Sequence, residues 1–234
     1  MKNPIRIWLL LAAVTILTFA PSAFGQATLT LNNPGSNVMG GVYVGPYNFT
    51  LTSAGQSQPI QLICDDAASE VFAGESWNVT TATFPTLANI KFPGPNQTQN
   101  YEEIAWLVQQ MYANIGNANT VGDIQWAIWD IFDGGVSSND PWGAVNSADQ
   151  ANIQNWLTQA GMSSNYSTGN YGNIVIYTPV PGTQPRQFGS PQEYFGLGTP
   201  VIAAPEPGTL AMLGIGLFAL GSLARRRLSI ARPQ

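Results

Sequence analysis

The chain has 234 residues, with thirteen acidic and eight basic residues, one cysteine, no histidine and a formal net charge of −5. Six basic residues flank two apolar stretches at the chain ends, so the middle keeps only Lys91 and Arg186 against twelve acidic residues, which argues against nucleic acid as a partner. The missing histidine excludes Ser-His-Asp and Cys-His catalysis and His-ligated zinc, and the single cysteine excludes an internal disulfide.

The first 25 residues have the three-part pattern of a secretory signal peptide. Lys2 and Arg6 form a basic start, residues 7–20 are almost entirely apolar, and small residues precede the cleavage site expected after Gly25. A membrane helix that stays in place is disfavoured because the apolar run is short and ends in small residues. We therefore expect an exported protein that loses residues 1–25.

The residues that follow, up to position 83, favour β-structure. Short runs rich in Val, Ile, Thr and aromatic residues alternate with turn sequences such as Asn-Pro-Gly and Gly-Pro. We expect strands at residues 28–31, 42–44, 47–52, 59–64 and 76–83. A loop with three prolines is expected to follow over residues 84–98.

Apolar residues then recur at helical spacing in three segments. Each segment starts with a residue typical of an N-terminal cap and a partner three positions later, namely Asn100 with Glu103, Thr120 with Asp123, and Ser147 with Gln150. Glycines after the second and third segments predict where those two helices end. Counted from Thr120 as the cap, Gln125 is expected in the second turn of its helix.

Strand patterns return after the third helix, at residues 173–178 and 192–197. We therefore predict one acidic α+β domain over residues 26–184, a β-rich sheet or barrel with an insertion of about three helices. An extended segment or linker is expected over residues 185–204, where proline and glycine are frequent.

The C-terminal thirty residues resemble the PEP-CTERM sorting signal of Gram-negative bacteria. The sorting motif is Pro205, Glu206 and Pro207. A transmembrane segment is expected directly after it, at residues 208–224. The basic stop-transfer run that follows is Arg225, Arg226 and Arg227. The resemblance implies an exosortase-type processing peptidase as a partner. It also implies an inner-membrane intermediate held by the C-terminal helix, then delivery to the cell surface or an exopolysaccharide matrix. A plain single-pass anchor is the alternative.

The single cysteine, Cys64, is followed by Asp65 and Asp66. Two neighbouring carboxylates disfavour a thiolate, so we do not expect a freely reactive nucleophile on the surface. One interpretation is a buried cysteine that ends a strand and packs as a small hydrophobic residue.

A second interpretation pairs Cys64 with Gln125. Residues 62–65 (LICD) and 124–129 (IQWAIW) resemble the thioester domains of Gram-positive surface adhesins, in which a strand-end cysteine is joined to the glutamine of a Thr-Gln-x-Ala motif. This chain has Ile124 where that family usually has threonine. The resemblance implies an internal Cys64–Gln125 thioester, shielded by Trp126 and Trp129, that reacts once with an amine or hydroxyl of a partner.

Weaker patterns concern metal and carboxylate chemistry. The weak calcium candidates Asp130, Asp133 and Asp140 lie near the end of the second helix, but their spacing is not that of an EF-hand and Asp-Gly-Gly also fits an ordinary turn. Adjacent carboxylates such as Glu102 and Glu103 point to different faces, which argues against a glycosidase pair.

Taken together, these patterns predict a structural or adhesive protein of the cell envelope or exopolysaccharide, with no enzymatic turnover and no cofactor. Covalent attachment through the thioester is the first form of that function. The alternative is a matrix protein that binds polysaccharide or calcium without covalent chemistry.

Overall fold

The computed structural model describes residues 27–134, 145–183 and 191–198, together with Gly216. The predicted signal peptide, the sorting motif, the basic run and Asp140 lie outside the described residues. Within the described ranges, no helix is both long enough and apolar enough to cross a bilayer. The architecture below is that of the compact unit formed by residues 26–202.

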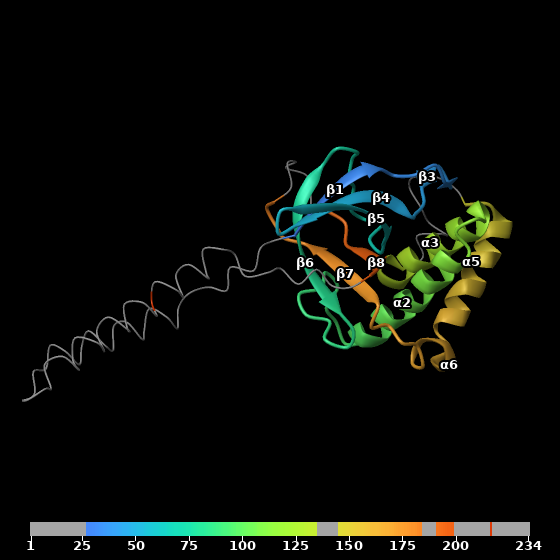
Figure 1. The fold of residues 1–234 in the computed structure, drawn as a ribbon. Helices are drawn as coiled ribbons and strands as arrows, with labels where there is room; N and C mark the ends of the chain where they lie inside the picture. Colours follow the sequence, from blue (N-terminus) through green and yellow to red (C-terminus); the bar gives the residue numbers. More distant parts are fainter. Residues whose placement is uncertain (1–26, 135–144, 184–190, 199–215, 217–234) are drawn as a thin grey trace, which may run out of the picture. The chain divides into compact units, whose positions relative to one another are not determined.

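Six antiparallel strands close into a barrel in the order β1-β4-β5-β8-β7-β6 (Figure 1). These strands are β1 (Ala27–Asn33), β4 (Tyr47–Ser53), β5 (Gln56–Cys64), β6 (Ser76–Thr83), β7 (Ile174–Pro179) and β8 (Tyr194–Leu197). The β-rich first half and the return of strands after the helices are therefore confirmed. A small hairpin of β2 (Val38–Met39) and β3 (Val42–Tyr43) connects β1 to β4, and its first strand was not predicted.

Alternation along the strands produces the barrel interior. In β1 and β4, every second residue is buried, and the inward-facing apolar side chains include Leu29, Leu31, Phe49 and Leu51. Because successive side chains of a strand point to opposite faces, one face fills the interior while the threonines between face outward. Closure of the barrel pairs the outer strands with each other, so the sheet has no free edge.

The helical insertion lies between β6 and β7 and consists of α2 (Gln97–Ala113), α3 (Ala118–Asp133), α5 (Ser147–Ala160) and the short α6 (Ser163–Tyr166). The helices pack together beside the barrel (Figure 1). The three long helices match the predicted insertion, which confirms the fold class. The short α6 was not predicted, because four residues are too few to show a helical period.

The helices begin earlier than predicted. Asn96 and Asn117 are the N-caps of α2 and α3, so Asn100 and Thr120 lie inside those helices. Asn146 caps α5 in place of Ser147, and its side chain accepts hydrogen bonds from the backbone N–H groups of the first turn. Asparagine is as good an N-cap as serine or threonine, so residue type alone does not identify the cap. The cap is the residue at which the backbone enters the helix.

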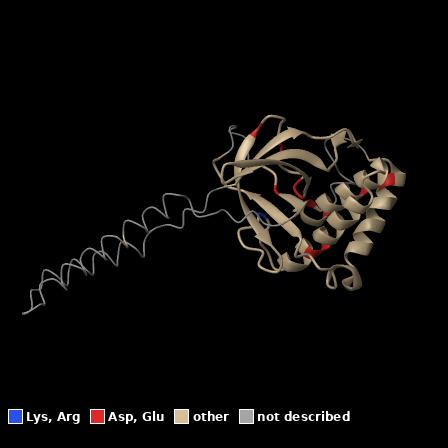
Figure 2. Cartoon of the chain, in the orientation of Figure 1, with Lys and Arg blue, Asp and Glu red and all other residues tan. Residues whose placement is uncertain are grey.

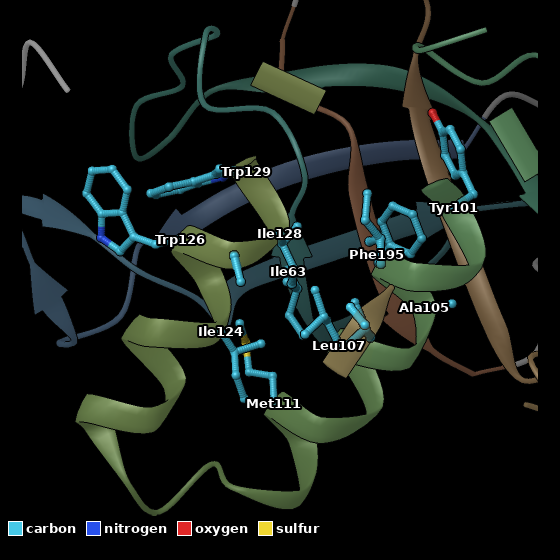
Figure 3. Packing of buried hydrophobic residues seen from close by; sticks show 14 of the residues in the cluster. Ile63, Tyr101, Ala105, Leu107, Met111, Ile124, Trp126, Ile128, Trp129 and Phe195 are labelled. Atoms are coloured by element: carbon cyan, nitrogen blue, oxygen red, sulfur yellow. The ribbon is translucent and has the colours of Figure 1, made fainter. Parts of the chain in front are cut away.

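Helix α3 is buried on all sides over ten consecutive residues, from Val121 to Asp130. It packs against α2 and α5 and also touches β5 and β2. Figure 3 shows Ile124 and Ile128 of α3 among the apolar side chains of α2 and of the barrel strands. A helix that is covered all round can hold a polar side chain away from water, and α3 carries Gln125.

The last strand corrects the predicted end of the domain. The strand expected at residues 192–197 is present as β8, within the stretch 185–204 that was otherwise expected to be extended or a linker, and it lies between β5 and β7 and completes the barrel. It pairs Phe195 with Ile63 and Tyr194 with Cys64. The globular domain therefore extends past residue 184, because the barrel closes only when this strand is included.

Candidate functional site

Cys64 is the last residue of β5 and is fully buried. Its side chain belongs to the apolar cluster inside the barrel, which includes Tyr47, Trp77 and Tyr194. The preceding residue, Ile63, belongs instead to the cluster shared with the helices. Cys64 thus lies where the barrel interior meets the helical layer.

Gln125 reaches Cys64 from α3 and is also fully buried. Its Nε2 atom donates a hydrogen bond to the Cys64 carbonyl oxygen at 2.6 Å, and its Oε1 atom accepts one from the Gly45 backbone N–H at 3.2 Å. The carboxamide is therefore held at both of its polar atoms. The structure places side by side the two residues that the sequence resemblance paired.

Gly45 was not singled out from the sequence, yet it is the residue that contacts the Gln125 oxygen. A Cβ atom at this position would lie 2.8 Å from Gln125 Oε1 and 3.3 Å from Tyr47 Cε2. Only glycine allows so close an approach of backbone to the carboxamide. An N–H group aimed at a carbonyl oxygen is also the arrangement that stabilises negative charge developing on that oxygen.

The thiol of Cys64 has backbone partners in the next turn of the chain. Its Sγ atom donates to the Asp66 carbonyl oxygen at 3.1 Å and accepts from the Asp66 N–H at 3.3 Å. Burial raises the pKa of the thiol well above its usual range, and the charges of Asp66 and Asp65 raise it further, against smaller opposing effects of the Asp66 backbone and Trp129. The sulfur is therefore a neutral thiol at neutral pH, as expected from the two neighbouring carboxylates.

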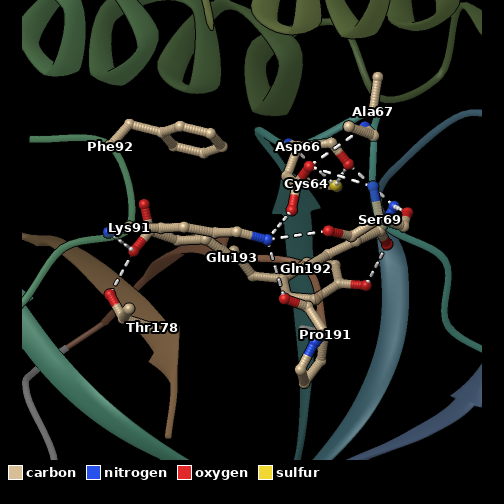
Figure 4. A network of polar contacts seen from close by, with 12 residues as sticks. Cys64, Asp66, Ala67, Ser69, Lys91, Phe92, Thr178, Pro191, Gln192 and Glu193 are labelled. Atoms are coloured by element: carbon tan, nitrogen blue, oxygen red, sulfur yellow. Dashed lines mark hydrogen bonds and ion pairs between the residues drawn. The ribbon is translucent and has the colours of Figure 1, made fainter. Parts of the chain in front are cut away.

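A buried polar network holds the chain just after Cys64 (Figure 4). The ammonium group of Lys91 forms an ion pair with Asp66 and also contacts Ser69 Oγ at 2.8 Å and the Pro191 carbonyl oxygen at 3.2 Å. In the described part of the chain, Lys91 is the one basic residue among many acidic ones (Figure 2). Its side chain therefore links the segment after β5, its own loop and the entry to β8.

Glu193 is the second centre of this network and is fully buried. Its carboxylate accepts hydrogen bonds from Tyr101 Oη at 2.5 Å, from the Lys91 backbone N–H at 2.9 Å and from Thr178 Oγ1. Burial and the charge of Glu193 raise the pKa of Asp65 well above its usual range, which favours the protonated acid there. Sequence reasoning missed Lys91 and Glu193 because neither stands in a motif.

Two tryptophans follow Gln125 on α3. Trp126 is fully buried and Trp129 nearly so, and their rings meet edge to face with centroids 5.3 Å apart. Both tryptophans are thus buried apolar neighbours of Gln125 along α3. The cap at Asn117 places Gln125 beyond the second turn, where it was expected from a cap at Thr120, and the helix dipole acts mainly within the first turn.

The calcium candidates do not converge in the described residues. Asp133 Oδ2 accepts a hydrogen bond from the Ala67 backbone N–H at 3.0 Å, so this carboxylate anchors the segment after Cys64. No group of three or more acidic, histidine or cysteine side chains within the described ranges is arranged to hold a metal ion. Asp130 is buried on α3, and Asp140 lies outside the described residues.

Comparisons with known proteins give two findings. Residues 203–227 match the PEP-CTERM protein-sorting motif, which confirms the resemblance drawn from the C-terminal residues. The chain is therefore an exported protein of the exosortase-sorted type found in Gram-negative bacteria, and the motif implies processing by an exosortase.

The second finding is a similarity of structure. The N-terminal thioester domain of fibronectin-binding protein SfbI from Streptococcus pyogenes matches with a TM-score of 0.43 and 13% sequence identity, over 77% of this chain and 96% of that chain. A search among curated proteins found no significant match.

Proposed function

We propose that this exported protein attaches covalently to a component of the cell envelope or extracellular matrix, through an internal thioester between Cys64 and Gln125. The observation that carries the proposal is the placement of the Gln125 carboxamide, which is buried against Cys64 and held at both polar atoms. Burial of a carboxamide is costly unless it is hydrogen-bonded, and these two hydrogen bonds fix the Gln125 side chain at Cys64.

Formation of the bond follows from the contacts. The Cys64 sulfur attacks the carboxamide carbon of Gln125, and the negative charge that develops on Oε1 faces the Gly45 N–H. The C–N bond then breaks, and the nitrogen leaves as ammonia with the proton of the thiol. The hydrogen bond from Nε2 to the Cys64 carbonyl oxygen fixes the carboxamide next to the residue that carries the sulfur, which reduces the entropy lost on reaching the reacting geometry.

Reaction with a partner consumes the bond. An amine or hydroxyl of the partner attacks the acyl carbon of Gln125, the C–S bond breaks, and the proton of the nucleophile passes to the Cys64 sulfur. The products are an amide or ester to the partner and a free thiol. Each molecule reacts once, so the activity is crosslinking without turnover.

Burial supports storage of the reactive bond. A thioester exposed to water hydrolyses, whereas the Cys64–Gln125 pair is fully buried and has Trp126 and Trp129 close by on α3. The polar network around Lys91 and Glu193 holds the segment after Cys64 in place, which limits access of water from that direction. The domain thus combines a reactive pair with a closed surrounding.

Intact mass tests the proposal on the full chain expressed with its export signals. We expect a parent chain lighter by one ammonia than its calculated mass, which takes up methylamine and then exposes a titratable thiol. Cys64→Ala and Gln125→Ala should each restore the calculated mass and abolish methylamine uptake. A folded parent chain with the calculated mass and no methylamine adduct would overturn the proposal.

A further inference from the structure

A pocket of about 410 Å³ is lined by Ala67, three residues after Cys64, and by Trp129, which lies on the same helix as Gln125. Its lining includes the aromatic residues Tyr43, Tyr47, Phe72 and Trp129 and one charged residue, Glu70. This volume lies within the range of roughly 300–1,000 Å³ that is typical of sites for small ligands. We call it the aromatic pocket.

Tyr47 and Trp129 are shared by the aromatic pocket and the reactive pair. The Tyr47 ring lies against Gly45, whose N–H group binds the Gln125 oxygen, and Trp129 stands four residues after Gln125 on α3. The pocket therefore shares Tyr47 with the surroundings of the Gly45 N–H group that binds the Gln125 oxygen. The pocket is thus a candidate site from which a nucleophile reaches the acyl carbon of Gln125.

The lining favours a ring that carries positive charge. Tyr43 lines the pocket and is 52% exposed, so part of its ring is accessible to solvent. Aromatic faces pack against the apolar faces of sugar rings and attract cations, and Glu70 adds a negative charge. An anionic polysaccharide is disfavoured by Glu70 and by the excess of acidic over basic residues in the described part of the chain (Figure 2).

The chemistry of the bond favours an amine over a hydroxyl. The chain has no histidine, the most frequent general base at neutral pH, and a neutral hydroxyl is a weaker nucleophile than a free amine. A lysine amine has a pKa of about 10.4 and stays protonated at neutral pH, whereas an amine beside oxygen-bearing carbons of a sugar ring is less basic and is partly free. A lysine side chain is also too slender to fill the aromatic pocket.

We propose that the aromatic pocket binds an amino-sugar unit of a polysaccharide and delivers its primary amine to the thioester, an inference that rests on the proposed function. The amine nitrogen attacks the acyl carbon of Gln125, the C–S bond breaks, and one amine proton passes to the Cys64 sulfur. The product is an amide between Gln125 and the sugar. No further reactant is needed.

Competition between nucleophiles tests this inference on the full chain. The probes are a glucosamine oligomer with free amines, its fully N-acetylated counterpart, a lysine-containing peptide and methylamine, each followed by intact mass at equal amine or sugar concentration. We expect the glucosamine oligomer to react at least about tenfold faster than methylamine or the peptide, and the N-acetylated oligomer to give no adduct.

Two variants locate the effect. Tyr43→Ala should lower the ratio of oligomer rate to methylamine rate about tenfold. Val38→Ala is the matched control, because Val38 is 58% exposed and is not part of the pocket lining, and it should leave the ratio unchanged. Equal rates for oligomer and methylamine, a faster peptide, or a ratio indifferent to Tyr43→Ala would overturn the amino-sugar inference while the thioester stands.

Absence of any methylamine adduct would instead refute the proposed function, and with it delivery to the thioester. A binding measurement with the Cys64→Ala variant, which cannot form the thioester, tests sugar binding by the pocket separately from the covalent reaction. In this variant the glucosamine oligomer should bind without covalent attachment, and the added substitution Tyr43→Ala should weaken binding. No binding in this variant would overturn the assignment of the pocket to sugars.

Discussion

Replacement of Gly45 by alanine tests whether its N–H group promotes thioester formation. The added Cβ would lie 2.8 Å from Gln125 Oε1, about 0.6 Å closer than the 3.4 Å at which ordinary contacts begin. Gln125 is fully buried, and its Nε2 atom is bound to the Cys64 carbonyl oxygen, so the side chain has little room to retreat. Any retreat of Oε1 stretches its 3.2 Å bond from the Gly45 N–H toward the limit for a hydrogen bond.

The expected effect on the reaction is large. Removal of one donor of this kind lowers rates by roughly 100-fold to 1,000-fold, or about 2.7–4 kcal/mol in the barrier. The effect on folding is smaller, because one extra methyl in a packed interior costs about 1–3 kcal/mol. Gly45→Ala should therefore fold and form the thioester about a hundredfold more slowly than the parent chain.

The assay follows loss of ammonia by intact mass at intervals after synthesis or refolding, with circular dichroism and thermal melting to establish the fold. Gly94→Ala is the matched control, since a Cβ at Gly94 meets no atom within 4 Å. This control should form the thioester at the parent rate. A folded Gly45→Ala chain that also forms it at the parent rate would refute the role given to the Gly45 N–H.

Two further predictions concern stability and pH. Lys91→Met leaves the buried Asp66 carboxylate without its cation and should lower the free energy of unfolding by about 2 kcal/mol in urea titration, whereas an unchanged midpoint would show that the ion pair contributes nothing. Burial and the charge of Asp149 raise the pKa of Asp123 to about 6, so the folded state binds more protons than the unfolded state and the parent chain should lose stability as the pH rises from about 4 to 6. Asp123→Asn should lack that loss in melting temperatures, and an identical pH profile would contradict the assignment.

Part of the candidate site could be predicted because its two central residues stand in recognisable local patterns. Cys64 after an apolar strand and Gln125 in an apolar helix were both visible from local pattern. Their contact was expected only through the resemblance to another family, since residues so far apart in sequence have no spacing rule. The role of Gly45 had no local signal, because a glycine between β3 and β4 also fits an ordinary turn.

The polar network around the site also combines residues that local sequence indicated with residues that only the fold brings together. Asp65 and Asp66 were noticed because they adjoin Cys64, but Lys91 and Glu193 come from a loop and from the entry to β8. Nothing in their neighbours along the chain predicts that they meet. These residues meet because closure of the barrel pairs β5 with β8 and so brings the segment after β5 next to β8.

The sequence by itself determined the C-terminal sorting motif, the acidic character and the order of most strands and helices, because these depend on composition, on a short motif and on periods of two and 3.6 residues. Tertiary structure alone decided which asparagines cap the helices, that β8 belongs to the barrel, and that Gln125 lies between Cys64 and Gly45. These features depend on contacts between distant segments. Their energies arise only when the barrel closes and α3 is buried against it, so no local pattern contains them.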